Sequence, residues 1–131
     1  VVKAVCTEGF VWANSGLAVI NGQAELFEQM ARGGFAAQIP ILKTMTHFSA
    51  ELIHIASKGD IVFTERVDHH WDEQGRDLMT PHICGVAEIR EGRISAFRDF
   101  YDVVCYSQTP TKAQKGFDLA SFRESQSKGE K

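Results

Sequence analysis

The spacing of apolar residues changes along the chain from a helical period to a period of two. Apolar side chains recur at helical spacing between Leu26 and Ala31, and Asn21 is a good capping residue just ahead of them. Earlier in the chain, residues 8–14 are aromatic and β-branched and stop at a Ser-Gly turn. The pattern predicts a short strand over residues 8–14 and an amphipathic helix over residues 21–32.

From Leu42 onwards apolar and polar residues alternate, and polar turn sequences interrupt the alternation at regular intervals. Short polar connections between successive strands give an antiparallel meander. A long twisted sheet must bury one face, and the predicted helix is the cover that this sequence offers. We therefore predict an α+β fold whose concave side forms a pocket. The predicted strands cover residues 44–57, 61–71, 78–90 and 94–104.

The length of 131 residues suits a single hydrophobic core, and we assign residues 1–109 to one domain. Residues 110–131 form a tail rich in Lys, Ser, Gln and Glu, with only three large apolar residues to anchor it. We expect this tail to be partly disordered, above all in residues 124–131. The three apolar residues are Phe117, Leu119 and Phe122.

Composition and charge argue against several classes of function. The formal net charge of −3, with acidic and basic residues mixed along the chain, provides no basic stripe for a nucleic acid. The apolar runs are far shorter than the roughly 20 residues that span a bilayer, so we expect no membrane partner. Cys6, Cys84 and Cys105 are widely spaced and form no CxxC pair, which argues against a disulfide framework or a structural zinc site. Together with a start that does not look like a secretory signal, they favour the cytoplasm.

The candidate chemistry lies on two of the predicted strands. Alternation places Arg66, Asp68 and His70 on one face of their strand. If Asp99 on the last strand also faces the pocket, the two carboxyls meet there with Arg66 between them. Two carboxylates in a poorly solvated site cannot both stay ionised cheaply, so one can act as an acid and the other as a base. Taken alone, however, an Arg-x-Asp pattern on a strand is most often a surface ion-pair ladder.

Three sequence segments, DIVFTERVD at residues 60–68, EGRISAFRDFYD at residues 91–102 and VWAN at residues 11–14, resemble the limonene-1,2-epoxide hydrolase family. They look like the family's strand with an arginine and an aspartate, its strand with a second aspartate, and its first strand. The resemblance implies the family's cone-shaped fold, which is cystatin-like and nuclear transport factor 2 (NTF2)-like. In this fold a strongly curved, mixed or antiparallel sheet packs against helices.

The resemblance also implies a role for each candidate residue. Asp99 would be the general base that takes a proton from water, and Asn14 would help to hold that water. Asp68 would be the general acid that protonates the epoxide oxygen, while Arg66 would bridge the two carboxyls. Attack and protonation would occur in one step, without a metal or an organic cofactor. The implied substrate is a small hydrophobic epoxide, terpene-like or cyclic, that is opened to a vicinal diol, and the implied assembly is a homodimer formed through the outer face of the sheet.

The chain departs from the family pattern in two places. The family has a water-positioning tyrosine where this chain has Trp12, whose indole N–H donates a hydrogen bond but cannot accept one. We therefore count Trp12 with the catalytic residues and expect a changed rate or substrate. The family also has one or more helices before its first strand, whereas this sequence has only residues 1–7 there, so we expect those helices to be missing.

Alternation also suggests a wall for the substrate pocket, although the same residues would serve equally well in a core. His70 would face the pocket and could tune substrate choice, or it could be an ordinary core histidine. The expected wall residues are His70, Ile83, Pro81, Met45, Ile41 and Phe97.

The remaining candidates have simpler structural explanations. Four residues could suggest a metal site, but two of them are adjacent histidines that point to opposite faces of a strand. Cys84 and Cys105 are expected to be small buried residues rather than nucleophiles, because neither has an evident histidine partner. Asp102 faces away from the pocket, and we expect it either to make structural hydrogen bonds or to belong to an interface. The four metal-site candidates are His69, His70, Asp72 and His82.

Two other functions stay open for this fold. The same cone hosts ketosteroid isomerase-like and SnoaL-like polyketide cyclase activities. An isomerase would need a base and an oxyanion donor, so the arginine-bridged pair favours hydrolysis. The third possibility is a non-catalytic NTF2-like domain for ligand binding or dimerisation, which would keep its ligand affinity when Asp99 is replaced by Asn.

Overall fold

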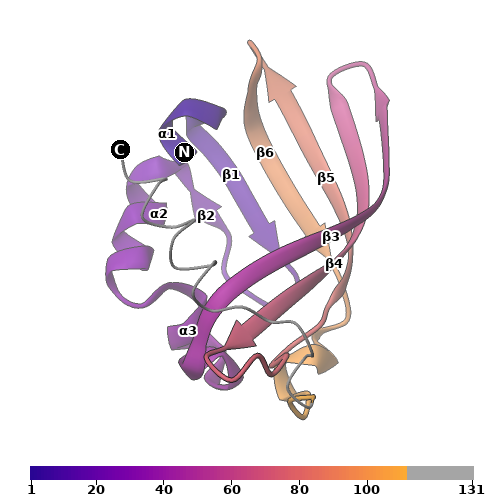
Figure 1. The fold of residues 1–131 in the computed structure, drawn as a ribbon. Coiled ribbons are helices and arrows are strands. Elements are labelled where there is room, and N and C mark those ends of the chain that lie inside the picture. Colours follow the sequence, from indigo (N-terminus) through magenta and orange to yellow (C-terminus); the bar gives the residue numbers. More distant parts are fainter. Residues whose placement is uncertain (112–131) are drawn as a thin grey trace.

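Six strands form one curved sheet in the order β2-β1-β6-β5-β4-β3, as Figure 1 shows for this computed structural model. The structure describes residues 1–111, so most of the expected tail lies outside the described residues. The strands are β1 (Cys6–Asn14), β2 (Ile20–Asn21), β3 (Met45–Lys58), β4 (Ile61–Asp72), β5 (His82–Arg90) and β6 (Arg93–Phe100).

The sheet is mixed, which confirms the predicted α+β class. Strands β3 to β6 pair with their neighbours in antiparallel fashion, as the meander predicts, while β1 lies parallel to β6. The hairpin between β5 and β6 turns on Glu91 and Gly92, which both have a positive φ. Two such residues are typical of the tight turn that matches strand twist.

Two predicted strands are shorter than expected. The strand predicted from residue 78 begins only at His82, because the preceding Pro81 has no N–H to donate to a ladder. The strand predicted to end at residue 104 ends at Phe100, because the next N–H, that of Tyr101, donates its hydrogen bond to the Ser15 hydroxyl. The 3-10 helix η2 (Val103–Ser107) follows, and Asp102 caps it by accepting a hydrogen bond from the Val104 N–H. The structural role expected of Asp102 is thus confirmed.

The long hairpin of β3 and β4 gives the sheet its curvature. The pairing of these two strands shifts register twice, between Met45 and His47 and between Leu52 and His54. Such bulges bend a strand and increase its twist. In Figure 1 the hairpin sweeps away from β1 and β6 and back toward the helices, so the sheet is strongly curved.

Short helices flank the curved sheet. They are α1 (Val2–Val5), α2 (Gly22–Ala31), α3 (Gly34–Gln38) and the 3-10 helix η1 (Pro40–Thr44). Of these, α3 and η1 supply residues that line a cavity. Asn21 is the N-cap of α2 as predicted, but its side chain does not cap the helix; instead the Glu25 carboxylate accepts a hydrogen bond of 2.7 Å from the Asn21 N–H. None of the described helices is long and apolar enough to cross a membrane.

Two apolar clusters fix the helices to the sheet. Leu26 of α2 packs with Cys6, Phe10 and Ile20, which attaches α2 to β1 and β2. At the other end of the molecule, η1, η2 and the loop before β5 share a cluster made of Ile39, Leu42, Leu78, Met79 and Cys105. Burying one such side chain contributes about 1.5 to 3 kcal/mol. The space between the two clusters is left for the pocket.

Candidate active site

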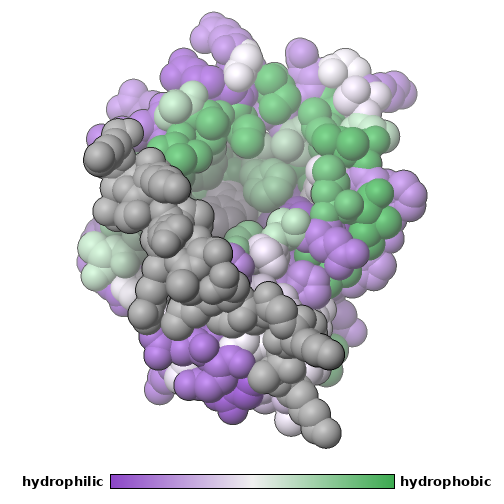
Figure 2. All heavy atoms as spheres, viewed as in Figure 1, coloured by the Kyte–Doolittle hydropathy of each residue, from purple (hydrophilic) through white to green (hydrophobic). Residues whose placement is uncertain are grey.

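Strand β4 points alternate side chains into the hollow. Arg66, Asp68 and His70 all line one cavity of about 440 Å³, as the alternation predicted. Their neighbours on the strand face the other side, where His69 pairs with Asp77. The hollow is visible in Figure 2 among mainly hydrophobic residues. A cavity of this size suits a small organic molecule.

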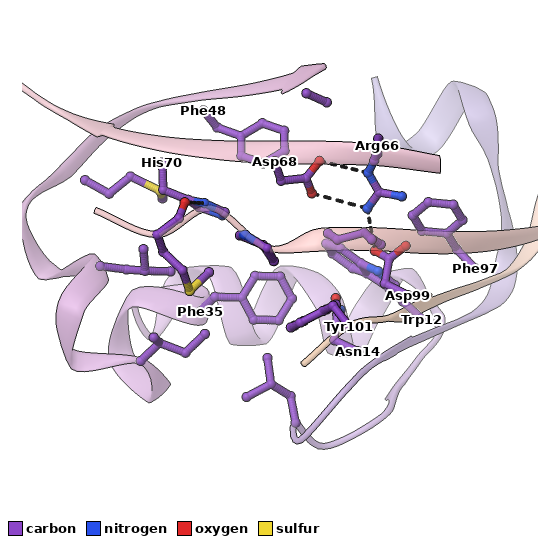
Figure 3. A pocket seen from close by; sticks show the side chains of 18 residues that line it. Trp12, Asn14, Phe35, Phe48, Arg66, Asp68, His70, Phe97, Asp99 and Tyr101 are labelled. Carbon is purple, nitrogen blue, oxygen red and sulfur yellow. Dashed lines mark hydrogen bonds and ion pairs between the residues drawn. The ribbon is translucent and has the colours of Figure 1, made fainter. Parts of the chain in front are cut away.

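Arg66 bridges the two aspartates, as expected from the sequence (Figure 3). Its Nε and Nη2 donate hydrogen bonds of 2.8 and 3.2 Å to the two carboxylate oxygens of Asp68. The same Nη2 donates a bond of 2.8 Å to Asp99 Oδ2. The side chains of Asp68 and Asp99 are only 8% and 3% exposed, so water screens these charges little. The site is therefore a buried charge cluster and not a surface ladder.

Burial sets the electrostatics of the cluster. Burial raises the pKa of Asp99, and the neighbouring charge of Asp68 raises it further, although the hydrogen bond and the positive charge of Arg66 work in the opposite direction. Burial also disfavours the charged form of Arg66, but its bonds to Asp99 and Asp68 outweigh that effect and raise its pKa. One arginine with one ionised and one protonated carboxyl gives a neutral group, which is the least costly state for a buried cluster.

Gly85 makes room for the arginine, and the sequence analysis did not identify it. It lies on β5 beside Asp99 of β6 and Thr64 of β4. A Cβ at this position would lie 2.6 Å from Arg66 Nη1, 2.6 Å from the Thr64 hydroxyl and 3.1 Å from Asp99 Oδ1. The Phe97 ring covers the guanidinium at 5.3 Å. A lone glycine inside a predicted strand signals such a close approach and could have revealed this one.

Strand β1 brings two further candidates to the same place. Parallel pairing sets Asn14 beside Asp99 and Trp12 beside Phe97, and both β1 residues line the cavity. The Trp12 ring is held edge-on by Phe35, with ring centroids 5.0 Å apart. Its N–H lies close enough to Asp99 to lower the pKa of that carboxyl. Among the described residues, however, neither Trp12 Nε1 nor Asp99 Oδ1 makes a hydrogen bond of normal geometry.

Five of the six expected wall residues line the cavity: His70, Ile83, Pro81, Met45 and Phe97. Ile41 is not among the lining residues and packs against the apolar cluster of η1 and η2 instead. In a 3-10 helix, residues three positions apart share a face. Ile39 and Leu42 therefore turn toward the cavity together, and Ile41 is rotated away.

Tyr101 is a wall residue that the sequence analysis did not assign to the pocket. Its hydroxyl lies 2.6 Å from that of Tyr106, which in turn donates to the Ser15 carbonyl. Because a carbonyl can only accept, the proton of Tyr106 is committed to Ser15 and Tyr101 donates to Tyr106. The Tyr101 oxygen is left as an acceptor, and burial raises its pKa.

The residues considered for a metal site each have a separate partner. His69 bonds to Asp77, His70 to the Met79 carbonyl, Asp72 to Arg76 and His82 to Glu65. Residues 1–111 contain no group of three or more His, Cys, Asp or Glu that could hold a metal ion. Cys105 is buried as expected, but Cys84 is exposed, because it lies on the outer face of β5 beside Glu65 and Phe100.

Comparisons with known proteins agree with this geometry. A family model described as the limonene-1,2-epoxide hydrolase (LEH) catalytic domain matches residues 1–110. Among solved structures, the chain is similar to an LEH-like epoxide hydrolase of M. tuberculosis, with 26% identity and a TM-score of 0.61 over 81% of this chain and 71% of that one. No curated protein matches the chain.

More distant structures share the fold alone. A protein from Catenulispora acidiphila with a ketosteroid isomerase-like fold has 13% identity and a TM-score of 0.60, over 79% of this chain and 74% of that one. A protein from Jannaschia that is described as SnoaL-like has 14% identity and a TM-score of 0.57, over 78% of this chain and 70% of that one. The predicted NTF2-like and SnoaL-like fold is thus confirmed.

Proposed function

The chain belongs to the limonene-1,2-epoxide hydrolase family, and we propose that it hydrolyses a small hydrophobic epoxide to a vicinal diol in one step without a cofactor. The observation that carries the proposal is the pair of buried aspartates that share Arg66 at the wall of a largely apolar cavity. An apolar cavity accepts a hydrocarbon skeleton, and the charged cluster supplies both a proton donor and a proton acceptor for ring opening.

We assign the base to Asp99. A raised pKa makes a carboxylate a stronger base, and burial raises that of Asp99. Its Oδ2 accepts a hydrogen bond from Arg66, while its buried Oδ1 makes no hydrogen bond with the described residues, so the carboxylate keeps an unused acceptor. Asn14 lies directly beside it on β1 and can orient that water through its amide.

We assign the acid to Asp68. Water attacks one ring carbon, the new C–O bond forms as the oxirane C–O bond breaks, and the released oxygen takes the proton of Asp68. The carboxylate that Asp68 becomes is stabilised by its two hydrogen bonds from Arg66. Each turnover thus moves one proton from Asp68 to Asp99. The return of this proton from Asp99 to Asp68 after release of the diol resets the site.

A substrate screen with matched variants tests the proposal. Purified protein is incubated with terpene and cyclohexene epoxides, and diols are measured by gas chromatography. We expect Asp68→Asn and Asp99→Asn each to abolish diol formation with an unchanged circular dichroism spectrum. Asp60→Asn, at an exposed turn, is the control and should behave like the parent. Substantial diol formation by either active-site variant would refute the assignment.

A single turnover in labelled water distinguishes one-step hydrolysis from a covalent route. Direct attack by water places the label in the diol at once. Label that appears first in an aspartate would instead mean that this carboxylate attacks the ring.

The same variants address the alternatives. A SnoaL-like isomerase or cyclase would consume its substrate without incorporating solvent oxygen. A non-catalytic NTF2-like binding domain would show no turnover by the parent and the same ligand affinity in Asp99→Asn. Diol formation that depends on both aspartates would exclude these two functions.

For the assembly we propose a homodimer formed through the outer face of the sheet. That face carries exposed apolar side chains on neighbouring strands, with Phe63 43% and Phe100 54% exposed. Phe63 pairs with Val86, and Phe100 pairs with Cys84, so these residues form a continuous strip. Light scattering should give the mass of two chains for the parent and of one chain for Phe100→Glu.

We also propose a cytoplasmic location, because all three cysteines are free.

A further inference from the structure

The imidazole of His70 is held in one orientation at the cavity wall. Its Nδ1 lies 2.8 Å from the Met79 carbonyl oxygen. The Phe48 ring packs against it edge to face, with centroids 5.3 Å apart. Because a carbonyl oxygen can only accept a hydrogen bond, Nδ1 must carry a proton.

The second ring nitrogen of His70 is therefore an acceptor. Burial lowers the pKa of His70, and this effect outweighs the bond to Met79 and the charges of Asp68 and Asp77, which act in the opposite direction. The ring is neutral near neutral pH, with its one proton on Nδ1. Nε2 then presents a lone pair and no hydrogen.

No group in the described part of the chain uses this lone pair. His70 makes its one ring hydrogen bond through Nδ1, and Nε2 is not among the polar atoms sealed from the cavity. Phe48 packs against the ring, Met79 supplies the carbonyl, and Met45 belongs to the same apolar lining of the cavity. Among the other polar groups of the wall, Arg66 donates hydrogen bonds to both aspartates and Tyr101 donates one to Tyr106.

The position of His70 relative to the aspartates sets the geometry of a ligand. His70 follows Asp68 by two positions on the same face of β4, a separation of about 7 Å along a strand. In Figure 3 His70 lies on one side of the cavity and Asp99 on the other, with Asp68 between them. A molecule whose oxirane lies between the aspartates would reach His70 with its opposite end.

We propose that His70 Nε2 accepts a hydrogen bond from a hydroxyl group of the substrate that lies across the carbon skeleton from the oxirane. The preferred substrates are then cyclic epoxides that carry a remote alcohol, and not pure hydrocarbon epoxides. This inference rests on the proposed hydrolase function, since it names the class of epoxide that the site selects. A bound hydrocarbon would cover Nε2 and leave it without a partner, whereas a hydroxyl replaces the hydrogen bond that water made there.

Three probes differ only at the remote position. They are the ring epoxides of α-terpineol, of its methyl ether and of limonene. The alcohol of α-terpineol can donate to Nε2, the methyl ether has the oxygen but no proton, and limonene has neither. We expect kcat/KM for the alcohol to exceed that for the ether roughly tenfold, the discrimination of one neutral hydrogen bond. In His70→Leu the ratio should fall to about one, because leucine cannot accept.

Two controls separate recognition from shape. Met45→Leu alters the same wall without touching Nε2 and should keep the preference for the alcohol over the ether. Calorimetry on Asp99→Asn, which leaves the epoxides intact, measures the same preference as a ratio of Kd values and does not require the His70 variant to fold. A roughly tenfold tighter binding of the alcohol is expected there.

The outcomes distinguish the two proposals. If the parent opens all three epoxides with equal kcat/KM, the role of His70 is refuted and the hydrolase assignment stands. An unchanged alcohol-to-ether ratio in a folded His70→Leu also refutes it. If the parent opens no epoxide, the hydrolase assignment fails, and equal Kd values for alcohol and ether would then refute the binding role of His70 as well.

Discussion

Replacing Gly85 by alanine should disable the site through a single methyl group. The added Cβ would lie 2.6 Å from Arg66 Nη1 and 2.6 Å from the Thr64 hydroxyl, whereas ordinary contacts begin at 3.4 Å. The guanidinium must move away, and it is tied to Asp68 and Asp99 by hydrogen bonds of 2.8 Å. A displacement of this size lengthens at least one of these bonds beyond its normal range.

The expected loss can be estimated for both stability and rate. A hydrogen bond to a charged group contributes about 1.5 to 3 kcal/mol. Misplacing a catalytic group by around 1 Å costs roughly a hundredfold in rate. In an ordinary strand position the same substitution would stabilise the fold by about 0.5 to 1 kcal/mol, because glycine loses more backbone freedom on folding than alanine. For Gly85→Ala we therefore expect a lower Tm and a kcat reduced about a hundredfold, with KM changed much less.

A second glycine in the sheet provides the matched control. Gly9 lies in β1, and a Cβ built there meets nothing within 4 Å. Gly9→Ala should keep the activity of the parent and a Tm at least as high. Thermal unfolding and steady-state kinetics on limonene epoxide measure both effects. A Gly85→Ala protein with the kcat and Tm of the parent would refute the reasoning, since the methyl group could then be accommodated without moving Arg66.

Four other substitutions test separate parts of the site. Arg66→Lys should lower kcat at least a hundredfold, because the ammonium of lysine cannot reproduce the planar set of N–H donors by which the guanidinium binds both aspartates. Steady-state kinetics measures the loss, and circular dichroism checks that the variant is folded. Tyr106→Phe should destabilise the fold by about 1 kcal/mol, because it removes the donor to the Ser15 carbonyl; urea unfolding measures this. For Asp99→Asn, stability should be compared with the parent across pH. The folded-state pKa of Asp99 is raised, so the folded parent binds the Asp99 proton more tightly than the unfolded chain does. The free energy of unfolding of the parent, relative to that of the variant, should therefore fall as the pH rises from the ordinary aspartate pKa through the raised one. A rise over that interval would contradict the assigned direction. Asn14→Ala should reduce kcat at least tenfold with little effect on KM, because Asn14 orients the water rather than the epoxide; equal losses in both parameters would argue against this role.

The parts of the fold that the sequence predicts best depend on local periodicity. The alternation in β4 placed Arg66 and Asp68 on one face correctly, because a period of two leaves no choice once the strand is recognised. The ends of strands were less accurate, as at Phe100, because the chain leaves the sheet for a tertiary partner, the Ser15 hydroxyl, that is 86 positions away in sequence. No local pattern encodes that partner.

The same distinction applies to the site. The convergence of Asp68 and Asp99 could be inferred from two strand patterns and a family resemblance. The role of Gly85 depends on three strands meeting around one guanidinium, and the position of Ile41 depends on whether η1 turns with a period of three or of four. Both are properties of packing, so they became visible only in three dimensions.

The arrangement around the proposed water explains why one strand pairing matters so much. β1 comes from the start of the chain and β6 from its end, and their parallel register sets Asn14 beside Asp99. β1 also supplies Trp12, which can donate but cannot accept. A water that gives one proton to Asp99 needs a second acceptor for its other proton, and of these two β1 side chains only the Asn14 amide provides one. With tryptophan in place of the family's tyrosine, the task of orienting the water falls mainly on a single amide, so this chain should tolerate a change at Asn14 less well than a relative in which a tyrosine hydroxyl shares that task.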